Sequence, residues 1–234
     1  MFVVSSREIT RTPRAIANAL GATLVKFPAR RLTPHATGLD MARDVFTYYP
    51  PDDLQFATVE SRDRFALVRD FARLNKFEQR KRLIDAGLPG VPVFGPGDIP
   101  PAGEYVLRSL RHRAQQNFER VTLYGIPNEI SILRYGSPWL EIEKEFRTYL
   151  VRGKPILTMF KATSGDDTQW STTKLDRLHL LEKLTMFAPL KYASLAGVDL
   201  AKTRDGNAVV FEVNFAPGLG PNNLDRIVSA LKGE

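Results

Sequence analysis

The sequence predicts a mixed α+β protein, and three features along the chain lead to this fold class. A short apolar run at 2–5, a helical pattern and a second apolar run at 22–27 have the order of a small β-α-β unit. A long amphipathic stretch at 62–86 predicts helix. Pairs of alternating apolar segments in the second half predict antiparallel hairpins. Because hairpins replace regular βαβ alternation there, the class is α+β or mixed α/β.

The elements of the first half begin and end at recognisable residues. The helix after Thr12-Pro13 has apolar residues at helical spacing, and Gly21 ends it. The helix predicted over 62–86 has Arg and Lys on its polar face and ends at Gly87. A strand is expected within 88–94 and another at 105–108, and the second leads into a basic loop.

The second half alternates hairpins with helix. The segments 145–151 and 156–160 are joined by an Arg-Gly-Lys-Pro turn, and 198–202 and 208–213 by an Arg-Asp-Gly-Asn turn. Between the two hairpins, apolar spacing predicts a helix over 175–197.

Composition narrows the class of protein. The chain has 234 residues, of which 43% are hydrophobic and 25% charged, which is typical of a folded globular protein and excludes collagen and disordered chains. It has no cysteine, which excludes disulfides, thiolate metal sites and thiol nucleophiles. No apolar run reaches the ~18–20 residues of a membrane span, and the N-terminal apolar run is too short for a signal peptide. We therefore expect a soluble, cytoplasmic protein without a membrane partner.

The net charge is positive and unevenly distributed. Residues 1–120 hold 19 basic and 13 acidic side chains, whereas 121–234 hold 14 and 13, and the total is +7. Such a balance favours a polyanionic partner: a nucleotide, a nucleic acid or an acidic peptide. Arginines also keep a small protein soluble, so the charge alone does not choose among these.

Three side chains of the last predicted hairpin form a candidate metal site. Asp199 lies on one strand, and Glu212 and Asn214, two residues apart, share one face of the other. Two carboxylates and an amide oxygen suit a hard cation such as Mg²⁺, or Mn²⁺ in its place.

The alternative is that these three side chains bind no metal and have only a structural role. Asp199 could end a strand, while Glu212 and Asn214 face solvent. The neighbours of Glu212 and Asn214 are apolar, however, and polar groups in a largely buried strand are costly unless a partner satisfies them. A metal ion would be such a partner.

At this point the sequence resembles a known family. Ala196-Gly197-Val198-Asp199 followed by Phe211-Glu212-Val213-Asn214-Phe215-Ala216-Pro217-Gly218-Leu219 is similar to the magnesium-binding C-terminal signature of ATP-grasp ligases. The ribosomal-protein glutamate ligases and a short phage-type branch are closest in character. Asn75-Lys76, which would open a helix before Ala86-Gly87-Leu88-Pro89-Gly90-Val91-Pro92, is similar to the N-terminal lobe of that family. The resemblance spans about residues 62–225.

The resemblance implies a fold and a reaction. The fold would be two α+β lobes with ATP between them: a pre-ATP-grasp β-α-β domain at 1–61, an N-terminal lobe at 62–138 and a C-terminal, magnesium-binding lobe at 139–234. A substrate carboxylate would attack the γ-phosphate to give an acylphosphate and ADP, and an amine would then displace phosphate to form an amide. The cofactors implied are ATP and Mg²⁺, and the substrate would be a small molecule, an amino acid or a peptide.

The resemblance also assigns roles to single residues. Arg147, in Glu145-Phe146-Arg147, would stabilise the transferred phosphoryl group. Lys76 and Arg108 would contact nucleotide phosphates. Arg111 and His112 lie where the family carries a glycine-rich lid; this loop has no glycine, so its side chains would contact the anions instead.

The resemblance implies roles for further residues. Glu141 and Ile142 lie where the hinge between the lobes would offer backbone groups to the adenine, and Glu141 or Glu143 would offer a carboxylate to the ribose. Lys161 would face a phosphate or the acceptor carboxylate. For each of these, and for Lys76 and Arg108, an ordinary position at the protein surface is the alternative.

Two other functions stay open at this stage. The basic first half with interleaved Phe71, Phe77 and Phe118 fits a nucleic-acid-binding module. The lid without glycine fits a degenerate ATP-grasp domain that binds nucleotide without ligating.

Overall fold

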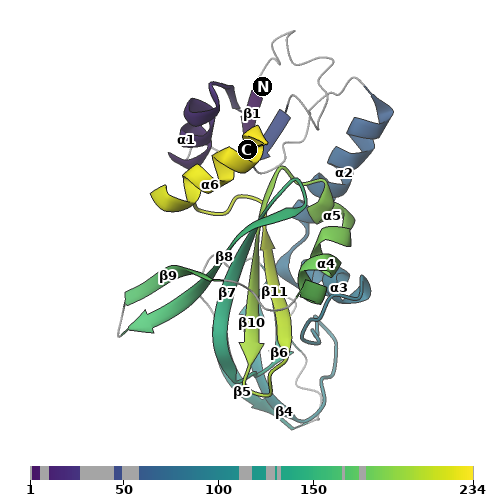
Figure 1. The fold of residues 1–234 in the computed structure, drawn as a ribbon. Helices are drawn as coiled ribbons and strands as arrows, with labels where there is room; N and C mark the ends of the chain where they lie inside the picture. The colour runs from purple at the N-terminus through teal and green to yellow at the C-terminus, as the bar shows by residue number, and fades with distance from the viewer. Residues whose placement is uncertain are drawn as a thin grey trace. The chain divides into compact units, whose positions relative to one another are not determined.

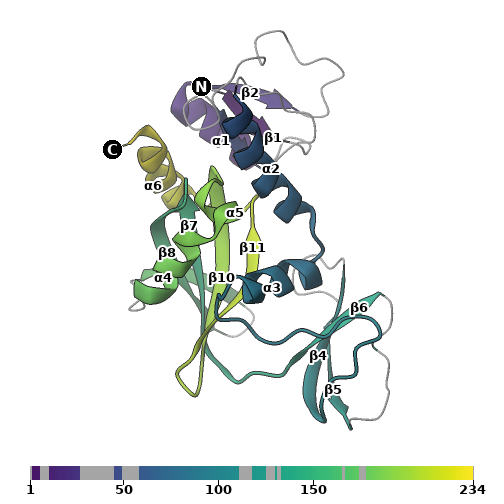
Figure 2. The same cartoon turned by 90° about the vertical axis from the view of Figure 1, so that its right-hand side faces the viewer.

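Three β-sheets organise the described part of the chain (Figures 1 and 2). The structure is a computed structural model, and the residues that it describes are 2–5, 11–26, 45–48, 58–110, 118–124, 130, 133–164, 167–173 and 178–233. Sheets and helices are mixed, as the predicted α+β class requires.

The N-terminal sheet is parallel, with strand order β2-β1-β3. It consists of β1 (Phe2–Ser5), β2 (Thr23–Lys26) and β3 (Val45–Tyr48), and α1 (Arg11–Leu20) connects the first two strands. The predicted β-α-β unit is therefore confirmed. The third strand was not predicted, because its four residues are too short a run to show alternation.

The single helix predicted over 62–86 is wrong, because the chain forms two. They are α2 (Val59–Arg73) and α3 (Lys76–Asp85). Asn75 begins the second helix with a capping box: its Oδ1 accepts from the Glu78 N–H at 2.9 Å, and its own N–H donates to Glu78 Oε2 at 3.3 Å. Because the apolar residues keep their helical spacing across the break, the spacing alone does not reveal it. Gly87 follows the helix with φ +77°, a conformation that favours glycine.

A second sheet is antiparallel, with order β5-β4-β6. Its strands are β4 (Gly103–Ser109), β5 (Phe118–Leu123) and β6 (Arg134–Pro138). The strand expected at 105–108 is confirmed as part of β4. The strand expected within 88–94 is wrong: that segment makes only isolated bridges at Gly90 and Phe94, since two prolines there lack the N–H that a strand ladder needs.

The largest sheet has five strands in the order β11-β10-β7-β8-β9. They are β7 (Ile142–Val151), β8 (Lys154–Ser164), β9 (Asp167–Thr173), β10 (Leu195–Thr203) and β11 (Ala208–Asn214). Both predicted hairpins, β7 with β8 and β10 with β11, are confirmed.

The helix predicted over 175–197 is too long. The chain forms α4 (Leu178–Met186) and α5 (Ala188–Lys191) and then enters β10 at Leu195. Pro189 lies in the first turn of α5, where a missing N–H costs nothing and a new helix can begin. The final helix, α6 (Pro221–Lys232), was not predicted.

The structure divides into two compact units, each made of several chain segments. Unit 1 comprises Met1–Arg73, Phe146–Val198 and Val213–Glu234, and unit 2 comprises Leu74–Glu145 and Asp199–Glu212. In unit 1, buried side chains from the N-terminal sheet, α1, β7, β8, β10 and α6 form one apolar cluster: Val3, Ile16, Ala17, Phe46, Tyr149, Val151, Leu157, Met159, Leu195, Ile227 and Leu231. In unit 2, aromatic pairs hold the core, with Phe77 against Tyr135 at 6.3 Å and Phe94 against Tyr105 at 5.8 Å.

None of the helices in the described ranges combines the length and the apolar character that crossing a membrane requires.

Candidate functional site

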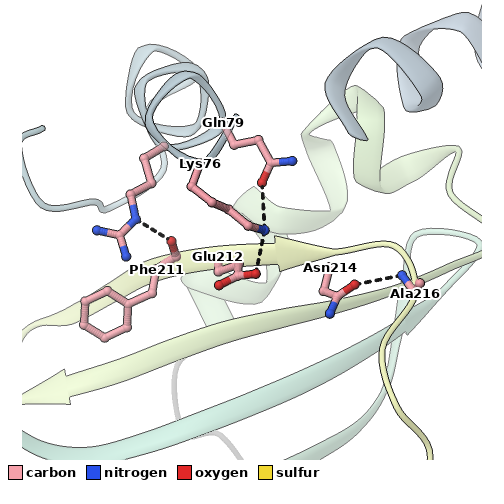
Figure 3. A network of polar contacts seen from close by, with 7 residues as sticks. Lys76, Gln79, Phe211, Glu212, Asn214 and Ala216 are labelled. Atoms are coloured by element: carbon pink, nitrogen blue, oxygen red, sulfur yellow. Dashed lines mark hydrogen bonds and ion pairs between the residues drawn. The ribbon is translucent and has the colours of Figure 1, made fainter. Parts of the chain in front are cut away.

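The first turn of α3 brings a lysine to a carboxylate of β11 within unit 2 (Figure 3). Lys76 Nζ lies 2.5 Å from Glu212 Oε1 and donates to Gln79 Oε1 at 3.4 Å. The two charged side chains are 24% and 30% exposed, so water screens the ion pair only in part. The capping box at Asn75 fixes Lys76 as the first helical residue.

A second cation of α3 is buried. Arg80 is 8% exposed, and its Nε donates to the carbonyl oxygen of Phe211 at 2.8 Å. Its guanidinium lies 5.5 Å from the ring of Tyr135 and 5.6 Å from that of Phe211. Burial lowers the pKa of Arg80, and the charge of Arg108 lowers it further, whereas Tyr135 and Glu212 raise it. Even so, an arginine stays protonated in a protein.

Strand β4 carries another cation of the candidate site, Arg108. Arg108 is paired in register with Phe118 of β5 and Tyr135 of β6, and its guanidinium lies 5.9 Å from the Phe118 ring. The Nε atom of Arg108 is buried and has no hydrogen-bond partner among the described residues. Because a buried donor without an acceptor is costly, this atom suits an anionic ligand.

Tyr135 is enclosed between these charges. It is 0% exposed, and burial raises the pKa of its phenol, while Arg80 and Arg108 act in the opposite direction. The phenol is therefore neutral at neutral pH. Within unit 2, Lys76 thus lies beside Glu212, and the charges of Arg80 and Arg108 act on Tyr135, an arrangement that attracts anions.

In unit 1, Arg147 lies on β7 against a glycine. A Cβ atom built on Gly197 would lie 2.9 Å from Pro217 Cβ and 3.6 Å from Arg147 Cδ. Tyr149, two residues along the same strand, donates from its hydroxyl to the carbonyl oxygen of Gly218 at 3.1 Å. The segment after β11 and the side chain of Arg147 thus pack on a surface that only glycine leaves open.

Asn214 ends β11 in unit 1. Its Oδ1 accepts from the Ala216 N–H at 2.9 Å, which fixes the orientation of the amide (Figure 3). A carbonyl-type oxygen has two lone pairs, so one remains for a cation. On the pleated strand, Glu212 and Asn214 are two residues apart and share a face.

The expected metal ligands are oxygen donors of the kind that Mg²⁺ prefers. Glu212 already binds a cation, the ammonium of Lys76, and Asp199 is half-buried on β10. Within the described ranges, no three His, Cys, Asp or Glu side chains gather in a way that could hold a metal ion. The predicted ligands, Asp199, Glu212 and Asn214, include an amide, so they are not a cluster of that kind. The donor chemistry fits Mg²⁺, and the assignment stays a prediction.

The other residues that the sequence predicted for the site lie on different segments of the chain. Arg111 and His112 fall outside the described residues. Glu141 accepts from Arg204 twice: its Oε2 lies 2.8 Å from Nη1, in an exposed ion pair, and its carbonyl oxygen 2.9 Å from the backbone N–H. Ile142 begins β7 and is 43% exposed, and Lys161 lies half-buried on β8, opposite Trp170.

Sequence reasoning missed Arg80 and Tyr135. Arg80 follows Lys76 by four residues and so lies on the same face of α3, a spacing that could have indicated it. Nothing in the sequence around Tyr135 indicates its position, because the register of β4 with β6 places it.

Solved structures share this fold along the whole chain. The ATP-grasp ligase PsnB, complexed with a minimal precursor, is 15% identical with a TM-score of 0.65, over 99% of this chain and 98% of PsnB. The chain has the ATP-grasp fold. The macrocyclase MdnC, bound with precursor peptide MdnA from Microcystis aeruginosa MRC, is 13% identical with a TM-score of 0.62, over 100% and 99% of the two chains. The D-cycloserine synthetase DcsG is 14% identical with a TM-score of 0.58, over 99% and 98%.

No family model matches the sequence, and neither does any curated protein. At 13–15% identity, the likeness to solved structures shows the fold that the sequence resemblance implies.

Proposed function

We propose that this chain is an ATP- and Mg²⁺-dependent ligase that joins a carboxylate to an amine through an acylphosphate. The observation that carries the proposal is a group of cations in unit 2: Lys76 pairs with Glu212, Arg80 is buried beside Phe211 and the ring of Tyr135, and the charge of Arg108 acts on both Arg80 and Tyr135. The ATP-grasp fold supports it, since similar chains are described as ligases and one is complexed with Mg and ADP. The predicted domains, 1–61, 62–138 and 139–234, belong to this proposal.

Each residue has a role that its chemistry supports. Arg108 and Lys76 bind the phosphates, the former through a buried donor that lacks a partner among the described residues. Arg147 stabilises the negative charge that develops on the transferred phosphoryl group. Asp199, Glu212 and Asn214 would hold the metal ion, which would supply positive charge to neutralise the phosphate oxygens.

The reaction needs no protein nucleophile. The substrate carboxylate attacks the γ-phosphorus, the bond to the bridging oxygen breaks, and ADP leaves. The amine then attacks the acyl carbon, loses a proton and displaces phosphate. The protein's part is to position the reactants and to stabilise charge.

The substrate class that we propose is an amino acid or peptide. PsnB and MdnC are described in complex with precursor peptides, and DcsG as a synthetase of D-cycloserine. A positively charged protein also favours an acidic peptide.

A screen for ATP-dependent phosphate release tests the proposal. The full chain is incubated with ATP, Mg²⁺ and sets of amino acids and peptides, and products are identified by mass spectrometry. We expect release of phosphate that needs both substrate and Mg²⁺, and a product lighter than its two substrates by one water. Nucleotide binding without any product across the screen would favour the degenerate domain instead.

A further inference from the structure

Lys76 places its own positive charge on the carboxylate that the proposed function assigns to a metal ion. Its Nζ lies 2.5 Å from Glu212 Oε1, in a pair that is partly shielded from water. An ammonium group and a divalent cation seek the same oxygen, and two cations beside one carboxylate repel each other. A metal ion that binds Glu212 therefore competes with Lys76.

Of the two cations that α3 directs toward β11, only Lys76 is free to move away. Arg80 is 8% exposed, bonded to the Phe211 carbonyl and covered by two rings. Lys76 is 24% exposed, and its flexible four-carbon chain is held by the side chains of Glu212 and Gln79. Displacement by a metal ion thus moves Lys76 and leaves Arg80 in place.

The displaced ammonium needs another anion. Lys76 is the first residue of α3, where the partial positive charge of the helix terminus favours an anion and disfavours a cation. Arg80 and Arg108 add further positive charge to the same unit. A nucleotide phosphate would compensate these charges when Lys76 leaves Glu212.

We propose that Lys76 exchanges Glu212 for a nucleotide phosphate, so that it opposes metal binding in the absence of nucleotide and favours phosphate binding. This inference rests on the proposed function, because it takes Glu212 as a metal ligand. Lys76 then weakens the binding of one ligand, the metal ion, and strengthens the binding of the other, the nucleotide. Because the two equilibria share this side chain, binding of each ligand promotes binding of the other.

Two titrations of the full chain test the exchange. Mn²⁺ binding without nucleotide is followed by electron paramagnetic resonance, and ADP binding in EDTA by calorimetry. We expect Lys76→Met to bind Mn²⁺ about three- to tenfold more tightly than wild type and ADP about tenfold more weakly. Lys81→Met is the matched control: it removes the same charge from an exposed position of the same helix and should change both affinities less than about twofold.

The two affinities are expected to change in opposite directions, which distinguishes this exchange from a structural role of Lys76. A damaged fold would lower the affinity for both ligands. Lys76→Gln gives the same pair of measurements should Lys76→Met fail to fold. A wild-type chain that binds neither ADP nor Mn²⁺ overturns the proposed function. A wild-type chain that binds both, with a Mn²⁺ affinity that Lys76→Met leaves unchanged or weakens, overturns the exchange alone.

Discussion

Arg80 donates its Nε proton to the carbonyl oxygen of Phe211 at 2.8 Å, and this bond ties α3 to β11 one residue before Glu212. A guanidinium that is 8% exposed is costly to bury unless its surroundings compensate the charge. Here a carbonyl oxygen, two aromatic rings and the charge of Glu212 do so. These contacts hold a positive charge in place close to Glu212.

Replacing Arg80 by Met should destabilise the protein by about 1–3 kcal/mol, because a charge-assisted hydrogen bond and two cation–π contacts are lost while desolvation is relieved. Urea unfolding measures the change. Arg82→Met, at an exposed position of the same helix, is the control and should stay within about 0.5 kcal/mol of wild type. Equal stability of the two variants would contradict the account of Arg80.

Tyr135 should make the free energy of unfolding fall at high pH. Burial raises the pKa of its phenol above the usual 10.0, so above that pH the unfolded chain loses the proton first and unfolding is favoured. The stabilisation is complete below pH 10 and is lost as the pH rises through the higher pKa of the folded state. Urea unfolding between pH 8 and pH 11 measures the slope for wild type and for Tyr135→Phe. The variant should show a shallower fall, and identical slopes would be evidence against this burial effect.

Gly197→Ala should destabilise unit 1 by about 1–3 kcal/mol and slow ligation. Its new Cβ would lie 2.9 Å from Pro217 Cβ, so the segment after β11 must shift beside Arg147. Gly218→Ala is the control, since a Cβ there meets nothing within 4 Å. Thermal unfolding and phosphate release are compared, and a Gly197→Ala protein as stable and active as the control would refute the packing argument.

Asn75→Ala should cost about 0.5–2 kcal/mol, the typical value for loss of a helix N-cap. The substitution removes the acceptor of the Glu78 N–H and loosens the first turn that carries Lys76. Urea unfolding measures the cost, and Asn75→Ser should recover most of it because serine also caps a helix. No difference between the alanine and serine variants would show that the cap does not stabilise α3.

The sequence predicted those parts of the fold that local patterns determine. Alternation and turn residues gave both C-terminal hairpins, and Gly21 and Gly87 gave two helix ends. Apolar spacing alone missed the break at Asn75, because the spacing runs through it. The family resemblance placed a helix start at Asn75-Lys76, and the capping box confirms that start.

For the candidate site, the sequence indicated single side chains whose chemistry suits it, and their role stays a prediction. Lys76, Glu212 and Arg108 were named from their motifs, and in the structure all three belong to the cationic part of unit 2. The pairing of Lys76 with Glu212 joins residues 136 positions apart and follows only from the packing of α3 on β11. Arg80 was missed for a related reason: a buried arginine looks like a surface arginine until its strand partner is known.

The most direct test of the central claim is the affinity of the full chain for ADP, measured by calorimetry with and without Mg²⁺, for wild type and for Glu212→Ala. We predict that Mg²⁺ strengthens ADP binding to wild type at least tenfold, and that Glu212→Ala removes most of this gain. An affinity for ADP that Mg²⁺ strengthens equally in both proteins would contradict the assignment of Glu212 to the metal. No ADP binding to wild type at millimolar concentration would contradict the proposed function as a whole.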